Sequence, residues 1–172
     1  EYNINSIYEY VKDGAIVVGV EPSCISALKD EYPDMFPEDK RTNSIAESTY
    51  LLQELIVKES KDKKFNFKKS DENKSYAVQV HCHEKTIIGE NISIESLKLI
   101  PKSQVKKIPS GCCGMAGAFG YEKEHYDISK KIAEDRLLPY IKKLDNQTQV
   151  AITGVSCRHQ ICLLYTSDAA DE

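Results

Sequence analysis

The stretch Tyr76–Val80 has the sequence YAVQV and runs directly into His81-Cys82-His83. A short, mostly apolar run of this length predicts a strand. Two further runs of the same kind are Ala15–Val20 (AIVVGV) and Gln149–Thr153 (QVAIT), and Val105–Ile108 predicts a weaker strand. The run AIVVGV is rich in β-branched residues and is typical of a strand buried on both faces. The sequence therefore predicts four strands.

Helical patterns separate these strands. Apolar residues spaced three and four apart predict helices. The first such stripe comprises Ile4, Ile7, Tyr8 and Val11. Further helices are expected over Ile25–Tyr32 and Ile92–Ile100. The segment Ser44-Ile45-Ala46-Glu47 has the Ser-x-x-Glu form of a capping box and predicts the start of a helix whose apolar face continues to Ile56.

A long helix is expected before the last strand. Its apolar face comprises Tyr121, His125, Ile128 and Ile132 and continues through Leu137 and Ile141 to Leu144. Pro139 has no backbone N–H, so it should kink or split this helix. Strands that alternate with helices favour a parallel sheet with right-handed crossovers. The predicted fold is a Rossmann-like α/β domain, in which helices flank a mostly parallel four-stranded sheet.

A cysteine follows each predicted strand after a few residues. These cysteines are Cys24, Cys82, the adjacent pair Cys112 and Cys113, and Cys157. The carboxyl ends of parallel strands lie at one edge of a sheet, where open α/β sheets bind their ligands. We therefore expect these five thiols to meet at that edge and to hold a metal centre. For any single cysteine, the alternative is a small buried apolar side chain.

Cys112 and Cys113 lie in a glycine-rich loop. Their Cα atoms are about 3.8 Å apart, below the usual disulfide range of about 4.4–6.8 Å, so a bond between them would be strained. Gly111, Gly114 and Gly117 leave the backbone free to turn tightly, and exposed N–H groups could then donate hydrogen bonds to cluster sulfides. No secretory signal opens the chain, which favours metal-binding or catalytic cysteines over structural disulfides.

These motifs together resemble a known family. Gly111-Cys112-Cys113-Gly114, preceded by His81-Cys82-His83 and followed by Ser156-Cys157-Arg158-His159-Gln160, is similar to the cysteine-rich CCG domain. That family occurs in a subunit of heterodisulfide reductase, the iron–sulfur subunit of glycolate oxidase and anaerobic glycerol-3-phosphate dehydrogenase. The segment Gly111–Ser129, with Glu21-Pro22-Ser23-Cys24, most resembles the C-terminal part of FAD-linked oxidases of the D-lactate dehydrogenase type.

The resemblance implies an iron–sulfur electron-transfer module of an FAD-linked 2-hydroxy-acid dehydrogenase, of the D-lactate or glycolate type. It implies a [4Fe-4S] cluster held by the five cysteines, and FAD on a domain upstream of this chain. The implied partners are the upstream FAD and ferredoxin-like domains of the same protein and an electron acceptor, such as a quinone, a cytochrome or another redox protein. The chain alone is not expected to be a complete enzyme.

One residue departs from the family pattern, which commonly ends in Cys-x-x-Cys. Gln160 stands at the second cysteine position, and Cys24 could supply the missing thiolate from the first strand. Cys162 lies near the same place, but residues 162–172 lack periodicity and resemble translated sequencing-adapter read-through. We expect a cysteine-rich domain over residues 1–161, followed by a non-native or disordered tail.

Four polar side chains are further candidates for cofactor binding. They are His81, His83, Arg158 and His159. Each histidine could ligate a metal or bond a sulfur, or could be satisfied by backbone or carboxylate groups. Because side chains alternate along a strand, only one of His81 and His83 would face the site. Arg158 could balance cluster charge or bind an anionic substrate, or form a surface salt bridge.

Composition argues against several other classes of protein. The net charge of −4, from 23 Lys and Arg against 27 Asp and Glu, argues against nucleic-acid binding. Acidic residues interrupt the lysines of residues 58–75, which we expect to be a solvated connection. No apolar run approaches the about 20 residues of a membrane span. We expect a cytoplasmic location, with peripheral attachment at the inner membrane face as an option, and a chain that starts at Glu1 is expected to be part of a longer protein.

Two other functions stay open. Zinc also binds Cys and His, typically with four tetrahedral ligands, although the short Cys-x-x-Cys pairs typical of zinc sites are missing. Metal-free thiol–disulfide chemistry, as in a heterodisulfide reductase, needs a cysteine of low pKa that attacks a substrate disulfide.

Overall fold

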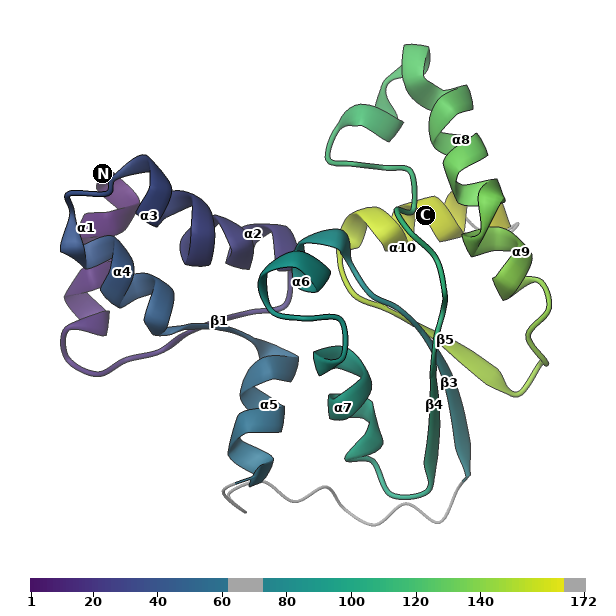
Figure 1. Ribbon diagram of the computed structural model, residues 1–172, viewed down its shortest axis with the longest axis horizontal. Coiled ribbons are helices and arrows are strands. Elements are labelled where there is room, and N and C mark those ends of the chain that lie inside the picture. The colour runs from purple at the N-terminus through teal and green to yellow at the C-terminus, as the bar shows by residue number, and fades with distance from the viewer. Residues whose placement is uncertain (62–72, 166–172) are drawn as a thin grey trace. The chain divides into compact units, whose positions relative to one another are not determined.

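The computed structural model describes residues 1–61 and 73–165 of the chain (Figure 1). These residues form two compact units, one of residues 1–61 with 83–92 and the other of residues 73–82 with 93–165. Each unit has its own parallel strands and its own apolar core. Residues 62–72, which make up most of the predicted solvated connection, and residues 166–172 of the predicted tail lie outside the described residues.

The first unit is mainly helical and contains a pair of parallel strands, β1 (Val17–Gly19) and β2 (Thr49–Leu51). Its helical segments are α1 (Tyr2–Val11), α2 (Pro22–Ser26), the π-helical turn Ala27–Glu31, α3 (Tyr32–Met35), α4 (Lys40–Glu47), α5 (Leu52–Lys61) and most of α6 (Cys82–Ile87). Ile4 and Val11 of α1 pack with Ile45 of α4 in the core. The predicted first helix and its apolar stripe are therefore confirmed.

The helix that precedes β2 begins earlier than the sequence predicts. Asp39 caps α4, because its carboxylate accepts a hydrogen bond from the N–H of Arg41 at 3.1 Å. Ser44 lies within α4, where its hydroxyl donates to the carbonyl of Lys40. The predicted capping box at Ser44 is wrong, because an aspartate upstream already satisfies the first turn of the helix.

The sequence pattern does not predict β2. The predicted helix from Ile45 to Ile56 is interrupted by this strand and resumes as α5. At the end of α4, the hydroxyl of Thr49 donates to the carbonyl of Ile45 at 2.6 Å. Three residues are too few for a strand periodicity to stand out between two helices.

The second unit contains a three-stranded parallel sheet. β3 (Lys74–Gln79) is the central strand, and it pairs with β4 (Ser103–Lys107) on one side and with β5 (Thr148–Ile152) on the other. All four predicted strands are confirmed as strands, and the α/β class with parallel pairing is confirmed. The prediction of one four-stranded sheet is wrong, because β1 pairs with β2 in the other unit.

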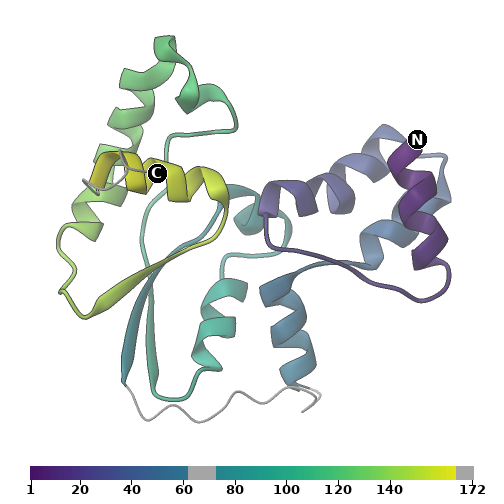
Figure 2. The ribbon, with the colours of Figure 1, turned by 180° about the vertical axis from the view of Figure 1, so that it is seen from behind.

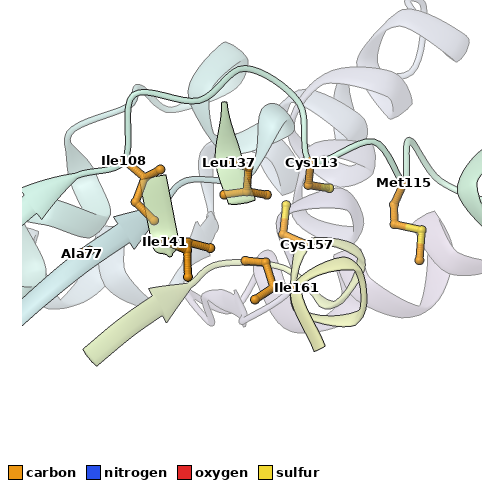
Figure 3. Packing of buried hydrophobic residues seen from close by; sticks show 8 residues of the cluster. All are labelled: Ala77, Ile108, Cys113, Met115, Leu137, Ile141, Cys157 and Ile161. Carbon is orange, nitrogen blue, oxygen red and sulfur yellow. The ribbon is translucent and has the colours of Figure 1, made fainter. Parts of the chain in front are cut away.

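Helices cover both faces of this sheet (Figures 1 and 2). On one face, α9 (Leu137–Ile141) and α10 (Val155–Tyr165) pack against Ala77 of β3. On the other face, α7 (Ile92–Lys98) packs against Val78, the next residue along the strand. Figure 3 shows the first of these cores, which comprises Ala77, Ile108, Cys113, Met115, Leu137, Ile141, Cys157 and Ile161.

Pro139 divides the predicted long helix, as expected. The chain forms α8 (Tyr126–Asp135) and then α9, and Arg136 between them leaves the helical conformation with φ −136°. Pro139 cannot donate a hydrogen bond to the carbonyl four residues earlier, that of Asp135. The missing hydrogen bond explains why the helix breaks at this point.

The predicted apolar face of α8 is wrong. Ile128 and Ile132 are exposed, whereas Ser129 and Ala133 are buried. The segments before α8 form two short 3-10 turns, Phe119–Tyr121 and Lys123–His125, rather than a continuation of the helix. In residues 1–61 and 73–165, no helix is long and apolar enough to cross a membrane.

Candidate metal centre

Four cysteines lie on three segments at the carboxyl edge of the β3–β5 sheet. Cys82 follows β3 and begins α6, Cys112 and Cys113 lie after β4, and Cys157 follows β5 as the third residue of α10. Parallel strands end at the same edge of a sheet, so the three segments start side by side. The fold therefore brings together these four of the five predicted cysteines.

The four thiols form a continuous row. The sulfur of Cys112 is hydrogen-bonded to those of Cys113 and Cys82, and Cys113 is hydrogen-bonded in turn to Cys157. Cys113 and Cys157 are buried, whereas Cys82 and Cys112 are half-buried. Figure 3 shows the sulfur of Cys157 directed toward the loop that carries Cys113.

The contacts within this row shift the pKa values of Cys112 and Cys113 in opposite directions. Hydrogen bonds from Cys113 and Cys82 lower the pKa of Cys112 to about 2, and the N–H groups of Gly114 and Ala116 act in the same direction. The contacts of Cys113 with Cys112 and Cys157, together with burial, raise the pKa of Cys113. Neighbouring thiols cannot all ionise without a cation, because like charges repel. A bound metal centre would remove this restriction.

Gly114 shapes the loop around the sulfurs. Its N–H donates a hydrogen bond to Sγ of Cys112 at 3.2 Å. Its φ is +102°, and a Cβ at this position would lie 2.3 Å from the carbonyl oxygen of Ser129. The N–H of Met115 is directed at Cys113 in the same way. The loop thus turns its backbone donors toward two thiols.

The other two glycines proposed for this loop differ from each other. Gly117 has φ +66° and follows Ala116, which has φ +41°, so two successive residues adopt the left-handed conformation. At Gly111, in contrast, φ is outside the left-handed region and a Cβ would meet no atom within 4 Å. Neither the backbone conformation nor the available space therefore requires a glycine at position 111.

Gln160 occupies the position of the second cysteine in the family pattern. It is buried, and its Nε2 donates to the carbonyl oxygen and the hydroxyl of Ser129, at 3.1 and 2.9 Å. A Cβ on Gly114 would lie 2.8 Å from the same nitrogen. Gln160 therefore links α10 to α8 behind the cysteine loop, and its side-chain nitrogen is turned toward Ser129.

His81 and His83 belong to different units of the chain. His81 is buried, and its ring nitrogen Nε2 lies 3.1 Å from the hydroxyl of Ser156. The backbone N–H of His81 donates a hydrogen bond to the hydroxyl of Thr153 at 2.8 Å. Nδ1 of His83 lies 3.1 Å from the hydroxyl of Ser26. Both rings have hydroxyl partners, which supports the interpretation of each as a hydrogen-bonded histidine.

Arg158 and His159 line a cavity of about 560 Å³ in the second unit. The cavity is lined by Met115, Gly120, Tyr121, Tyr126, Arg158, His159, Cys162 and Leu163. The phenol oxygen of Tyr121 lies 2.5 Å from Nδ1 of His159. Burial and the nearby Cys113 raise the pKa of Tyr121. Met115, which lines the cavity, also packs in the core with Cys113.

Cys24 belongs to the first unit, so the structure does not place it in the row. It is exposed and lies on α2, after β1. Because β1 pairs with β2, the argument from a shared sheet edge does not apply to Cys24, and its role as a ligand stays a prediction. Cys162 is half-buried and lies on α10, which continues to Tyr165 into the region predicted to be a tail.

The donors of this row fit an iron–sulfur cluster. In the described ranges 1–61 and 73–165, no three His, Cys, Asp or Glu side chains are placed to hold one metal ion together. In such a cluster each thiolate binds a different iron atom. The row supplies four cysteines, the usual ligand number, and backbone donors directed at the sulfurs.

Two side chains that shape the site are not among the residues that the sequence predicts for it. They are Ser129, which receives Gln160, and Gln79, which accepts a hydrogen bond from Ser110 at the end of β3. Both contacts join segments far apart in the chain and depend on how the helices and strands pack. Ser129 ends the segment that resembles the family, but nothing in the sequence indicates its contact with Gln160, and Gln79 has no local sequence signal.

The chain is distantly related to parts of two kinds of dehydrogenase. It is 29% identical over 155 residues to D-2-hydroxyglutarate dehydrogenase of Haemophilus influenzae, a match that covers 87% of this chain and 15% of that protein. It is 28% identical over 183 residues to a subunit of the anaerobic glycerol-3-phosphate dehydrogenase of Escherichia coli, a match that covers 94% of this chain and 43% of that protein.

The chain thus spans less than half the length of either relative. A D-2-hydroxyglutarate dehydrogenase of Pantoea ananatis is 26% identical, and the match covers 14% of that protein. No protein-family profile matches the chain. No solved structure matches it either.

Proposed function

We propose that this chain is an electron-transfer module that binds a [4Fe-4S] cluster through Cys82, Cys112, Cys113 and Cys157. The observation that supports this most strongly is the row of four thiols assembled from three strand ends. Thiolates of cysteine are the usual ligands of such clusters. The distant relationship to two kinds of dehydrogenase supports a redox role over a purely structural one.

The residues of the chain would bind the cluster and set its environment. When bound, the cluster supplies the ability to accept and release one electron at a time. Cys113 and Cys157 lie in the apolar core and would keep water from one side of the site. The N–H of Gly114 would stabilise charge on the sulfur of Cys112. Cys157 lies in the first turn of α10, where the helix dipole favours a thiolate.

We further propose that the module serves an FAD-linked dehydrogenase of 2-hydroxy acids. The name of one relative, D-2-hydroxyglutarate dehydrogenase, supports this substrate class. The substrate would transfer a hydride to FAD on another part of the protein and leave as the 2-oxo acid. The two electrons would then reach the cysteine row one at a time and pass to a quinone, a cytochrome or another redox protein.

Single substitutions of the four cysteines test the cluster assignment. After anaerobic reconstitution with iron and sulfide, C82S, C112S, C113S and C157S should each lose most of the bound iron and sulfide and the visible absorption. A serine hydroxyl is a much poorer ligand for this centre than a thiolate. Cys162→Ser is the matched control, because Cys162 is also half-buried in the same unit but lies outside the row. If all four variants keep the iron of the unsubstituted protein, the assignment is wrong.

One observation favours thiol–disulfide exchange as a second candidate. The pKa of Cys112 is lowered by its neighbours, and a thiolate is the attacking form in such exchange. Cys112→Ser should then abolish reaction with a small disulfide and leave the metal content unchanged. If the substitution instead releases iron, this candidate function is contradicted.

A further inference from the structure

Gln79 has an unmatched polar group at the edge where the thiols meet. It is the last residue of β3, and its side chain is fully buried. Its side-chain oxygen accepts a hydrogen bond from the hydroxyl of Ser110. Within the described part of the chain, its Nε2 has no hydrogen-bond partner. Turning the amide over would leave the oxygen unmatched instead, so neither orientation satisfies both atoms.

An unpaired buried amide destabilises the fold. A methionine at this position would fill a similar space and would have no amide that needs a hydrogen-bond partner. Buried polar groups in folded proteins are nearly always hydrogen-bonded, and each exception requires an explanation. A bound group that accepts a hydrogen bond at this edge of the sheet would explain the unmatched amide.

The amide lies among the segments that carry the thiols. Gln79 precedes Cys82 by three residues, and Ser110, which holds the amide oxygen, precedes Cys112 by two. The carbonyl of Gln79 accepts a hydrogen bond from the N–H of Thr153 at 3.2 Å, at the end of the strand that leads to Cys157. Gln79 therefore contacts both neighbouring strand ends.

The side chain of Gln79 also lies on the face of the sheet that packs against the buried thiols. Residues two apart on a strand share a face. Ala77 is two residues before Gln79, and it packs in one core with Cys113 and Cys157. The unmatched amide is thus on the same side of the sheet as this pair of cysteines.

We propose that Nε2 of Gln79 donates a hydrogen bond to a sulfur atom of the bound cluster and that the hydroxyl of Ser110 orients the amide for this contact. This inference rests on the proposed function. A hydrogen bond to cluster sulfur stabilises the more negative, reduced state and so raises the reduction potential. Gln79 contacts the cluster without being a ligand of iron, and Ser110 is the positioning residue in this arrangement.

The test is the midpoint potential of the reconstituted protein, measured by a redox titration followed by electron paramagnetic resonance. Gln79→Met keeps the length of the side chain and removes its donor. We expect the equilibrium between reduced and oxidised cluster to shift about tenfold toward the oxidised form, which is about 59 mV for a one-electron couple. Gln149→Met is the matched control, because it makes the same replacement at an exposed position of β5 and should leave the potential unchanged.

Ser110→Ala provides a second variant at a half-buried loop position, for use if Gln79→Met fails to fold. It removes the group that orients the amide and should shift the potential in the same direction by a smaller amount. Iron and sulfide are determined for every protein. If Gln79→Met has normal iron and sulfide and an unchanged potential, the role of Gln79 is overturned and the proposed function stays intact. This result is expected if an ordered water satisfies the amide. Absence of iron and sulfide from the unsubstituted protein would instead overturn the proposed function.

Discussion

At the scale of single residues, Gly114 determines how closely the backbone approaches the sulfurs. Its N–H reaches the sulfur of Cys112, and Ser129 packs where a side chain would otherwise lie. Gln160 donates to the same Ser129 and supports the loop from behind. The cysteine positions depend on these neighbours, which act through shape rather than through metal chemistry.

We expect Gly114→Ala to destabilise the fold more than Gly117→Ala does. Both glycines have positive φ, so each substitution should cost about 1–2 kcal/mol of unfolding free energy from backbone strain. Only Gly114 adds a collision, because its Cβ would lie 2.3 Å from the carbonyl oxygen of Ser129, whereas Gly117 faces open space. Urea unfolding of both variants measures the difference. Equal losses of stability would show that the close approach at Gly114 is unimportant.

The sequence predicts those site residues that form a recognisable motif, which are the cysteines. Cysteine is uncommon and chemically distinct, so Cys82, the pair 112–113 and Cys157 stand out without a structure. The roles of Gln79 and Gln160 were not predictable, because glutamine is usually a surface residue and only packing shows that these two side chains are buried.

At the scale of elements, the rule that parallel strands end at one edge gives the correct result for three strands. It fails for β1, because the three-residue strand β2 provides a partner for β1 in the other unit. The strands themselves were predictable from their apolar runs. Their distribution between two sheets was not, because pairing depends on a short strand that has no sequence signal of its own.

The start of α4 gives a prediction at this scale. Asp39→Ala should lower the melting temperature at neutral pH, because it removes the cap from the first turn, whereas Ser44→Ala within the same helix should have little effect. The hydrogen bonds from Arg41 lower the pKa of Asp39 in the folded state. The stabilisation by Asp39 is therefore complete above the pKa of the unfolded chain, about 3.9, and is lost as the pH falls through the lower folded pKa.

Thermal unfolding from pH 7 to pH 2 measures this effect. The difference in melting temperature between the unsubstituted protein and Asp39→Ala should shrink toward the acid end of the range. A difference that stays constant with pH would contradict the role of the Asp39 carboxylate as a charged cap.

At the scale of the whole molecule, the chain consists of two units and matches only part of each relative. Cys24 and the row of four thiols are in different units, so sequence resemblance alone connects them. We expect Cys24→Ser to retain bound iron but to change the electron paramagnetic resonance spectrum of the reconstituted protein, if Cys24 replaces the cysteine missing at position 160. An unchanged spectrum would mean that the four thiols of the second unit are sufficient.

Binding of a cluster should also stabilise the folded chain. A ligand that binds only the folded state stabilises it by about 2.7 kcal/mol at one hundred times its Kd. For a chain of 172 residues, this raises the melting temperature by roughly 5–10 °C. Anaerobic calorimetry before and after reconstitution measures the shift. Cys113→Ser should show no such shift, and an equal shift in this variant would mean that the stabilising metal binds elsewhere.

The most direct measurement is the content of iron, acid-labile sulfide and zinc in the protein after anaerobic purification and reconstitution, together with its visible absorption. We expect a brown protein with about four iron and four sulfide per chain, and loss of both when Cys112 or Cys113 is replaced by serine. A colourless protein that carries one zinc and no sulfide would contradict the assignment of the four thiols to an iron–sulfur cluster.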